Sequence, residues 1–581
     1  MATDSADPAI DLTISENIKS LIESYQRMSM PMGQYLTFIL VPAFAFFLVT
    51  IILPFFLSGQ PIFVRIPIPL LGLLAFGSAV FYPKILLGQR RRQLNNQFHL
   101  MVTHMTVLAI TKIDRMEVFR SLANEEEYGE LAKEMARIVE LVDTWNQSLD
   151  DALRRRAKEV PSDSVTDLFD RLAYTLGAGQ EMSDFLFEEQ GVIIENYRTI
   201  YEQSLENLDV MKDLYLSMVL SMTFALVFAI VLPILTGTNP TWTVAAVIAM
   251  FMFVQIGFFL VIRAIVPYDP LWYLEPGYRT RSKQLLIGSS IVAVVLFVII
   301  VLSMTASTFG VSPFTLLVPM ESIPKPLYLA IPTLPFLLPA FVFRRQENAI
   351  VERDEEFPSF IRALGASESA KQSTTSTVLR TLRKKDFGSL TETIDSLYRR
   401  LNMRIDTSSA WRYFAEDTKS YVIQKFSEMY LIGREMGGEP KLLGELISQN
   451  MNQIAQLRER RRQVTVTLIG LLYGISAASA FAFFTGLEIA VIMSGFDIDV
   501  GGGQMEFGQL LHTEMYNVPL LRYLLLLVLL FNAVMSALTI RTADGGHYGN
   551  ALLHFVALIW VGCMTAVATE TLISTLLEVD V

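Results

Sequence analysis

Long apolar stretches recur along the whole chain, and they constrain the fold more than any other feature of the sequence. A helix needs about 18 to 20 apolar residues to cross the ~30 Å hydrocarbon core of a bilayer. The composition agrees with repeated crossings, since 52% of the residues are hydrophobic and the mean hydropathy is +0.40. The sequence therefore predicts an all-α polytopic membrane protein with about nine transmembrane helices, at 35–57, 66–82, 214–236, 242–262, 285–307, 326–343, 464–494, 518–540 and 551–577.

Charged residues that flank these stretches predict the orientation of the chain. Residues 1–34 are polar and acidic, and they lack the short basic start and apolar core of a cleaved signal, so we expect the first span to be retained. Positive charge collects on the cytoplasmic side of membrane proteins. A cytoplasmic N-terminus, in a multi-pass protein of the cell membrane, places nearly all flanking cations inside: Lys84, Arg90, Arg91, Arg92, Arg263, Arg279, Arg281, Lys283, Arg344, Arg345, the "RERRR" of 458–462 and Arg541. Arg65, Lys325 and Arg522 then lie at or near the outer face.

This orientation divides the chain into alternating membrane and cytoplasmic parts. Helical spacing of apolar residues, as in Val165, Leu168, Phe169 and Leu172, is typical of a helical-bundle core. Ser164 or Ser162 is a suitable N-cap for that helix. The predicted parts are a cytoplasmic segment 1–34, span pair 35–82, cytoplasmic helical domain 83–213, span pair 214–262, cytoplasmic loop 263–284, span pair 285–343, cytoplasmic helical domain 344–463, and three spans in 464–577 with an external loop 495–517.

The order of these parts indicates a tandem duplication. Two spans, a cytoplasmic domain and two more spans occur twice, followed by one extra span. Because the repeated unit has an even number of spans, both copies have the same orientation, unlike the inverted repeats of many transporters. A shift of 259 residues pairs Phe98 with Phe357, Lys112 with Lys371, Tyr128 with Phe387, Gly129 with Gly388 and Leu131 with Leu390.

The segment "GREMGGEPKLLGEL", 433–446, has two glycines at the spacing of a phosphate-binding loop. Such a loop needs a Lys and then a Ser or Thr after its last glycine, whereas Glu439 and Pro440 occupy those places here. The residues before Gly433 have helical spacing, although a phosphate loop follows a strand. We therefore predict a helix, a turn and a second helix that carries Leu442, Leu443 and Leu446.

Residues that could perform catalysis or bind a cofactor or metal are scarce, so the chain is predicted not to be an enzyme. The single cysteine, Cys563, excludes an intrachain disulfide and thiolate metal sites. His99 and His104 are five residues apart, which does not align two ligands on one helix face. A net charge of −11 argues against a nucleic-acid partner. We predict no catalytic, cofactor or metal site.

Ionisable residues inside the membrane are the usual mark of a transporter. Arg65, Glu488, Arg522 and Glu570 are the candidates, and all four fall near the outer ends of their spans, where they can reach the surface or pair with each other. Gln255 and Asn532 are uncharged and are interpreted as helix-packing contacts. A transporter thus remains an alternative from another functional class.

Two sequence segments resemble one known family. "WNQSLDDALRRRAKEVPSDSVTDLFDRLAYTLGAGQEMSDFL", from Trp145, and "FSEMYLIGREMGGEPKLLGEL", from Phe426, look like the domain of the type II secretion system F family, the membrane platforms of type IV pilus-like machines. The nine spans look most like the archaeal members, which are archaellum assembly platforms. The first copy departs from the pattern, since it has "GAGQEMSDFL" where the second has the fuller glycine turn.

The resemblance implies a non-enzymatic protein that works beside a motor. A separate hexameric secretion ATPase would dock from the cytoplasm, and its cycles would drive pilin-like or archaellin subunits from the membrane into a filament. Other machine components and a homodimer are implied as well. The alternatives within this class are the platform of an archaeal adhesion pilus or of a type II secretion-like system.

Opposite charges at repeat-equivalent positions suggest where partners dock. The first domain has an acidic triplet where the second has a basic one, and such clusters can join the two domains or bind an ATPase surface. The alternative to docking is that both triplets lie in solvated loops without a partner role. The docking candidates are Glu125, Glu126 and Glu127, then Arg154, Arg155 and Arg156, then Arg383, Lys384 and Lys385, and in the glycine turn Arg434, Glu435 and Glu439.

Overall fold

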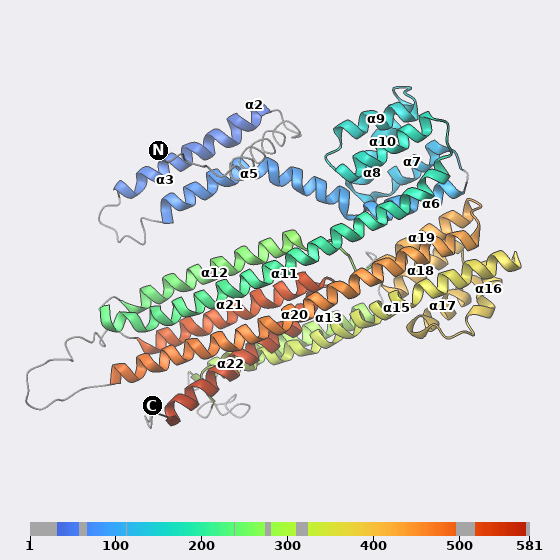
Figure 1. The fold of residues 1–581 in the computed structure, drawn as a ribbon. Coiled ribbons are helices and arrows are strands. Elements are labelled where there is room, and N and C mark those ends of the chain that lie inside the picture. The colour runs from blue at the N-terminus through green and yellow to red at the C-terminus, as the bar shows by residue number, and fades with distance from the viewer. Residues whose placement is uncertain are drawn as a thin grey trace, which may run out of the picture. The chain divides into compact units, whose positions relative to one another are not determined.

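All regular elements in the computed structural model are helices, within the residues that it describes: 32–56, 67–111, 113–236, 239–273, 281–308, 323–372, 374–495 and 517–576 (Figure 1). This confirms the predicted all-α class. Arg65, Arg279 and nearly all of the predicted external loop 495–517 lie outside the described residues. The chain divides into two compact units, Met1–Ile193 and Ile194–Val581, and each is described by itself.

Eight helices in the described part of the chain are long and apolar enough to cross a membrane, and they coincide with eight of the nine predicted spans. The protein is a polytopic membrane protein. The prediction at 66–82 falls on the first half of α5 (Pro67–Asn96), which is not one of the eight, so the number nine stays a prediction. The eight candidates are Gly33–Pro54, Met182–Pro233, Pro240–Ile265, Lys283–Thr305, Leu327–Lys371, Pro440–Ile492, Val518–Asp544 and Tyr548–Leu576.

The first unit opens with a helical hairpin. Helices α2 (Met32–Tyr35), η1 (Leu36–Leu40) and α3 (Val41–Phe56) follow one another directly, and α5 lies beside them (Figure 1). The Tyr35 hydroxyl donates a hydrogen bond of 2.6 Å to the carbonyl of Ala79, and the rings of Phe47 and Phe76 stack at 5.8 Å. These contacts pair the apolar half of α5 with a helix that can span the membrane.

A helical bundle follows α5 in the first unit. It consists of α6 (Phe98–Ile110), α7 (Arg115–Asn124), η2 (Glu126–Tyr128), α8 (Glu130–Asp143), α9 (Leu149–Glu159) and α10 (Asp163–Gly177). The stripe predicted for α10 is buried at Val165, Leu168, Phe169 and Leu172, which confirms its role in the core. Of the two candidate caps, Ser162 is the N-cap, and its hydroxyl accepts from the backbone N–H of Val165.

The second unit combines apolar helices with a second bundle. Helix α11 (Met182–Thr236) runs into it from the first unit, followed by α12 (Pro240–Ile265), α13 (Arg281–Thr308), α14 (Leu327–Ala330), η4 (Ile331–Phe336) and α15 (Leu337–Lys371). The second bundle contains α16 (Thr375–Leu382), η5 (Gly388–Leu390), α17 (Thr391–Asn402), α18 (Thr407–Thr418) and α19 (Tyr421–Glu435). The last helices are α20 (Pro440–Gly495), α21 (Val518–Asp544), η8 (Tyr548–Asn550) and α22 (Ala551–Leu576). Helices α11, α12, α20, α21 and α22 share one apolar core.

The two bundles repeat the same order of helices, from α7 to α11 in the first copy and from α16 to α20 in the second. Gly129 and Gly388, which the shift of 259 residues pairs, have φ of 55° and 53°. L-residues with a side chain rarely adopt this backbone conformation, so both turns need glycine. Tyr128 and Phe387, the preceding residues, are both buried. The tandem repeat therefore extends to backbone geometry.

Candidate functional site

The glycine turn of the second bundle connects two helices. Helix α19 ends at Glu435 and α20 begins at Pro440, which confirms the predicted helix, turn and helix. Arg434 donates to Glu368 on α15 at 2.9 Å and to the carbonyl of Gly438 at 3.0 Å. The Arg434 side chain therefore fastens the turn to α15. Glu435 and Glu439, the other two docking candidates here, are exposed.

The repeat-equivalent charged turns are largely accessible. In the first bundle, Glu126 and Glu127 are exposed and Glu125 is half-buried. In the second bundle, Lys384 and Lys385 are exposed. Arg383 is less exposed, because its guanidinium pairs with Asp395 at 3.0 Å and lies 4.4 Å from the centre of the Tyr398 ring. The exposed members of both triplets stay candidates for docking.

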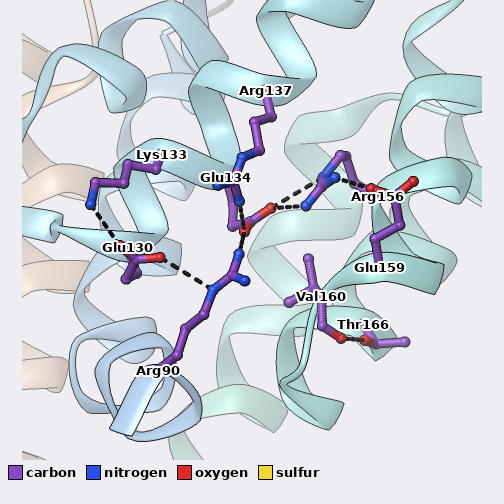
Figure 2. A network of polar contacts seen from close by, with 9 residues as sticks. All are labelled: Arg90, Glu130, Lys133, Glu134, Arg137, Arg156, Glu159, Val160 and Thr166. Carbon is purple, nitrogen blue, oxygen red and sulfur yellow. Dashed lines mark hydrogen bonds and ion pairs between the residues drawn. The ribbon is translucent and has the colours of Figure 1, made fainter. Parts of the chain in front are cut away.

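A buried carboxylate joins α5 to the first bundle (Figure 2). Glu134 on α8 is fully buried, and Arg90 of α5 donates to it at 2.9 Å. Arg156 of α9 donates to the other oxygen at 3.1 and 2.5 Å, and Arg137 pairs with the oxygen that Arg90 binds. Because a buried charge is costly unless it is paired, these arginines fix three helices around one carboxylate.

The three arginines at 154–156 therefore separate into two kinds. Arg156 lies on the buried stripe of α9 with Ala152, Leu153 and Ala157, and it also pairs with Glu159. Its side chain stabilises the bundle and is not available for docking. Arg154 and Arg155 are exposed, so these two stay candidates.

A second polar junction lies in the second unit, where α15 and α20 meet the segment after α12. The guanidinium of Arg458 donates twice to Asp269, at 2.8 and 2.7 Å, and once to Asp354 on α15, at 2.6 Å. Burial raises the pKa of Asp354 to about 6, so its carboxyl is ionised at neutral pH beside Arg458.

Two more arginines extend this junction to α21. Arg461 donates to the carbonyls of Ala543 and Thr542, at 2.7 and 3.1 Å, and so satisfies the open end of α21. Arg541 pairs with Glu347 on α15 at 2.6 Å. The sequence interpretation treated 458–462 mainly as a marker of orientation. Arg458 and Arg461 instead point inward, three residues apart on one helix face, while Arg460 and Arg462 are exposed.

Comparison with known proteins gives the family. Residues 101–232 match the family described as type II secretion system (T2SS), protein F. The chain is 33% identical over 562 residues to flagella accessory protein J of Methanocaldococcus jannaschii, covering 96% of this chain and 98% of that protein. This chain belongs to the flagella accessory protein J family. It is also 32% identical over 524 residues to flagella accessory protein J of Methanococcus voltae, covering 89% of this chain and 92% of that protein. No solved structure matches.

Polar groups between the apolar helices of this flagella accessory protein J family member form helix contacts. The amide of Gln255 on α12 donates to Asn532 on α21 at 2.7 Å, and both side chains are buried, which confirms the predicted packing role. Arg522 lies 3.7 Å from Glu488 and 3.3 Å from Glu570, which confirms that these charges pair with each other. In the described part of the chain, no group of three or more His, Cys, Asp or Glu residues is placed to hold a metal ion.

Lys419 has a backbone conformation that is strained for a residue with a side chain, and its charged group is largely buried. It ends α18 in the left-handed conformation, with φ of 58°, and only 9% of it is exposed. Burial, and then Arg353, lower the pKa of its ammonium group from 10.5 to about 8. The bond from its ammonium to Gln346 is long, at 3.4 Å.

We expect Lys419→Gly to stabilise the protein. Glycine adopts this conformation freely, whereas L-residues pay about 1 kcal/mol, and the buried charge disappears as well. In the native chain the folded state binds fewer protons than the unfolded state between pH 8 and 10.5, so stability rises with pH there. The gain of the variant, measured as a thermal midpoint in detergent, should be largest below pH 8 and shrink above it. Lys419→Ala, which removes the charge and keeps the strain, should gain less; an equal gain would refute the strain argument.

Proposed function

We propose that this chain is the membrane platform of a type IV pilus-like machine, with its N-terminus and both bundles in the cytoplasm. In this proposal it couples a hexameric secretion ATPase to the assembly of pilin-like subunits into an archaellum filament. The names of the two relatives, flagella accessory protein J, support the filament, and the match to type II secretion system protein F supports the class of machine. The membrane-spanning helices support the platform role.

The observation that carries the proposal is the length of α11 and α20. They contain 55 and 56 residues, so each is about 80 Å long at 1.5 Å per residue. Each begins in a bundle, as the burial of Leu186 and Leu443 shows, and each ends in an apolar stretch that can cross the membrane. A movement imposed on either bundle therefore reaches the membrane through one continuous helix. Such coupling needs no catalytic group in this chain.

We propose that the ATPase binds at the exposed charged turns of the two bundles. Lys384 and Lys385 offer exposed cations, and Glu126 and Glu127 offer the opposite charge, also exposed, at the equivalent place in the first bundle. Complementary charge mainly sets the association rate and the choice of partner. The two turns would thus engage different patches of one ATPase hexamer.

Binding of the ATPase to the full-length protein in nanodiscs tests the proposal. Lys384→Glu with Lys385→Glu should weaken binding at least 10-fold and lower the ATP hydrolysis that the platform stimulates, because like charges then face each other. Arg362→Glu with Arg412→Glu is the matched control, since it reverses two exposed charges of the same domain. Equal binding by both variants would reject the turn as the docking site.

A deletion strain separates this function from its alternatives. Loss of archaella with normal solute uptake is the expected result. Loss of adhesion pili with intact archaella would assign the chain to an adhesion pilus, and lost solute uptake with intact filaments would assign it to transport.

A further inference from the structure

The guanidinium of Arg458 holds together two chain segments that are far apart in sequence. Its Nε and one terminal nitrogen bind both oxygens of Asp269, and its other terminal nitrogen binds Asp354. The nitrogen that binds Asp269 also donates to the carbonyl of Pro270 at 3.3 Å. A guanidinium has a fixed planar arrangement of donors, so three such bonds define the relative orientation of their acceptors.

The segment that carries Asp269 is itself attached to the second bundle. The N–H of Tyr273 donates to the carbonyl of Lys419 at 2.8 Å, and the N–H of Tyr421 donates to the carbonyl of Leu271 at 3.1 Å. These bonds form an isolated antiparallel bridge between the segment and the start of α19. We call the segment from Asp269 to Tyr273 the strap. Arg458 thus connects α20 both to α15 and to this strap, which is bonded to the second bundle.

Aromatic packing and Arg541 fix the same strap to α15 and to the end of α21. The indole of Trp272 donates to Glu347 at 3.4 Å, and Glu347 also accepts from Arg541 at 2.6 Å. The ring of Trp272 lies 5.4 Å from that of His547, just after α21. Four separate parts of the second unit therefore meet within one layer of polar and aromatic contacts.

The first copy has no charged residue at the positions equivalent to Arg458 and Asp354. Asn95 stands 259 residues before Asp354, and it accepts a hydrogen bond from Ser162 at 2.5 Å. Ile200 and Thr199 stand 258 and 259 residues before Arg458. The nearest arginine, Arg198, is exposed and pairs with Glu195 and Glu202 of its own helix. The pair of Arg458 and Asp354 is thus not repeated, and the first copy instead joins α10 to α11 through Arg171 and Glu189, at 2.7 Å.

We propose that an ionic clamp centred on Arg458 makes the second bundle one rigid body with α15, α20 and α21. Arg458 is a positioning residue that acts through Asp269 and Asp354. The rigidity follows from the contacts alone, whereas its use in filament assembly rests on the proposed function. Force applied to the second bundle then passes to the apolar helices through these contacts.

Spin-label distances in the full-length protein test the clamp. Labels at Met403→Cys, on the second bundle, and Tyr548→Cys, after α21, use exposed positions, and Cys563→Ala removes the native thiol. Arg458→Gln alone leaves two facing carboxylates and risks unfolding. The decisive variant therefore neutralises all three groups: Arg458→Gln with Asp269→Asn and Asp354→Asn.

The triple variant should at least double the width of the distance distribution between the two labels. Arg458→Lys, which keeps the charge and loses the planar fork, should give an intermediate width. Arg460→Gln is the matched control, since this arginine is exposed on the same helix, and it should leave the width unchanged. An unchanged width in a folded triple variant would overturn the clamp. A broadened distribution in a protein whose deletion leaves archaella intact would keep the clamp and reject the proposed function.

Discussion

Gly365→Val should destabilise the protein by about 3 kcal/mol, because it separates the two helices that cross in the second bundle. A Cβ atom on Gly365 of α15 would lie 2.2 Å from the carbonyl oxygen of Pro440, and one on Gly444 of α20 would lie 2.7 Å from the carbonyl oxygen of Ile361. Both obstacles are backbone atoms, so no side chain can rotate away. The only relief is to move α20, whose position the bundle and the apolar helices both need.

The thermal midpoint of the purified protein in detergent measures this effect. Gly470→Ala is the control, because Gly470 lies on α20 with nothing within 4 Å of an added Cβ atom. Alanine favours a helix over glycine by up to about 1 kcal/mol, so the control should be neutral or slightly stabilising. A midpoint for Gly365→Val that matches the control would show that α15 and α20 do not cross this closely.

Glu134→Ala should destabilise the first bundle by about 3 to 5 kcal/mol, the usual cost of removing one partner of a buried ion pair. The substitution leaves Arg156, which is only 8% exposed, without its main carboxylate partner. It also removes one of the two carboxylates that Arg90 pairs with, the other being that of Glu130. Because Arg90 belongs to α5, the loss should also loosen the bundle from the hairpin helix.

Hydrogen exchange of α5 and α8 in the full-length protein checks both consequences. Glu140 is an exposed glutamate on α8, and Glu140→Ala should change the free energy of unfolding by less than about 0.5 kcal/mol. Raising the salt concentration should not rescue or mimic the variant, since buried pairs are weakly screened. Equal behaviour of the two variants would show that Glu134 does not organise the bundle.

The membrane helices could be predicted from the sequence because hydropathy is a local property. Eight of nine predicted spans coincide with candidate spanning helices, and the spacing of residues alone predicts the apolar stripe of α10 and the turn between α19 and α20. The prediction at 66–82 rests on a shorter apolar stretch with several prolines, and it falls on the first half of α5.

The polar junctions could not be predicted, because their partners are distant in sequence. Arg458 lies 189 residues from Asp269 and 104 from Asp354. In the sequence these arginines belong to a basic run before a span, which is also the pattern of an orientation signal. Their three-residue spacing was the available clue, since Arg458 and Arg461 share a helix face that Arg460 does not. Gln255 and Asn532 were recognisable because an amide in an apolar helix needs a partner.

The strap at Asp269 to Tyr273 bears on how the duplicated halves depend on each other. It follows α12, the last helix of the first copy, yet its hydrogen bonds go to the second copy. If the chain were cut at the boundary between the copies, directly after α12, the strap would remain at the N-terminus of the second half. If the chain were cut after Tyr273 instead, the second half would lose Asp269, one of the two carboxylates that bind Arg458, and the bridge to α19. An exchange of halves between relatives should therefore keep the strap and the second half together.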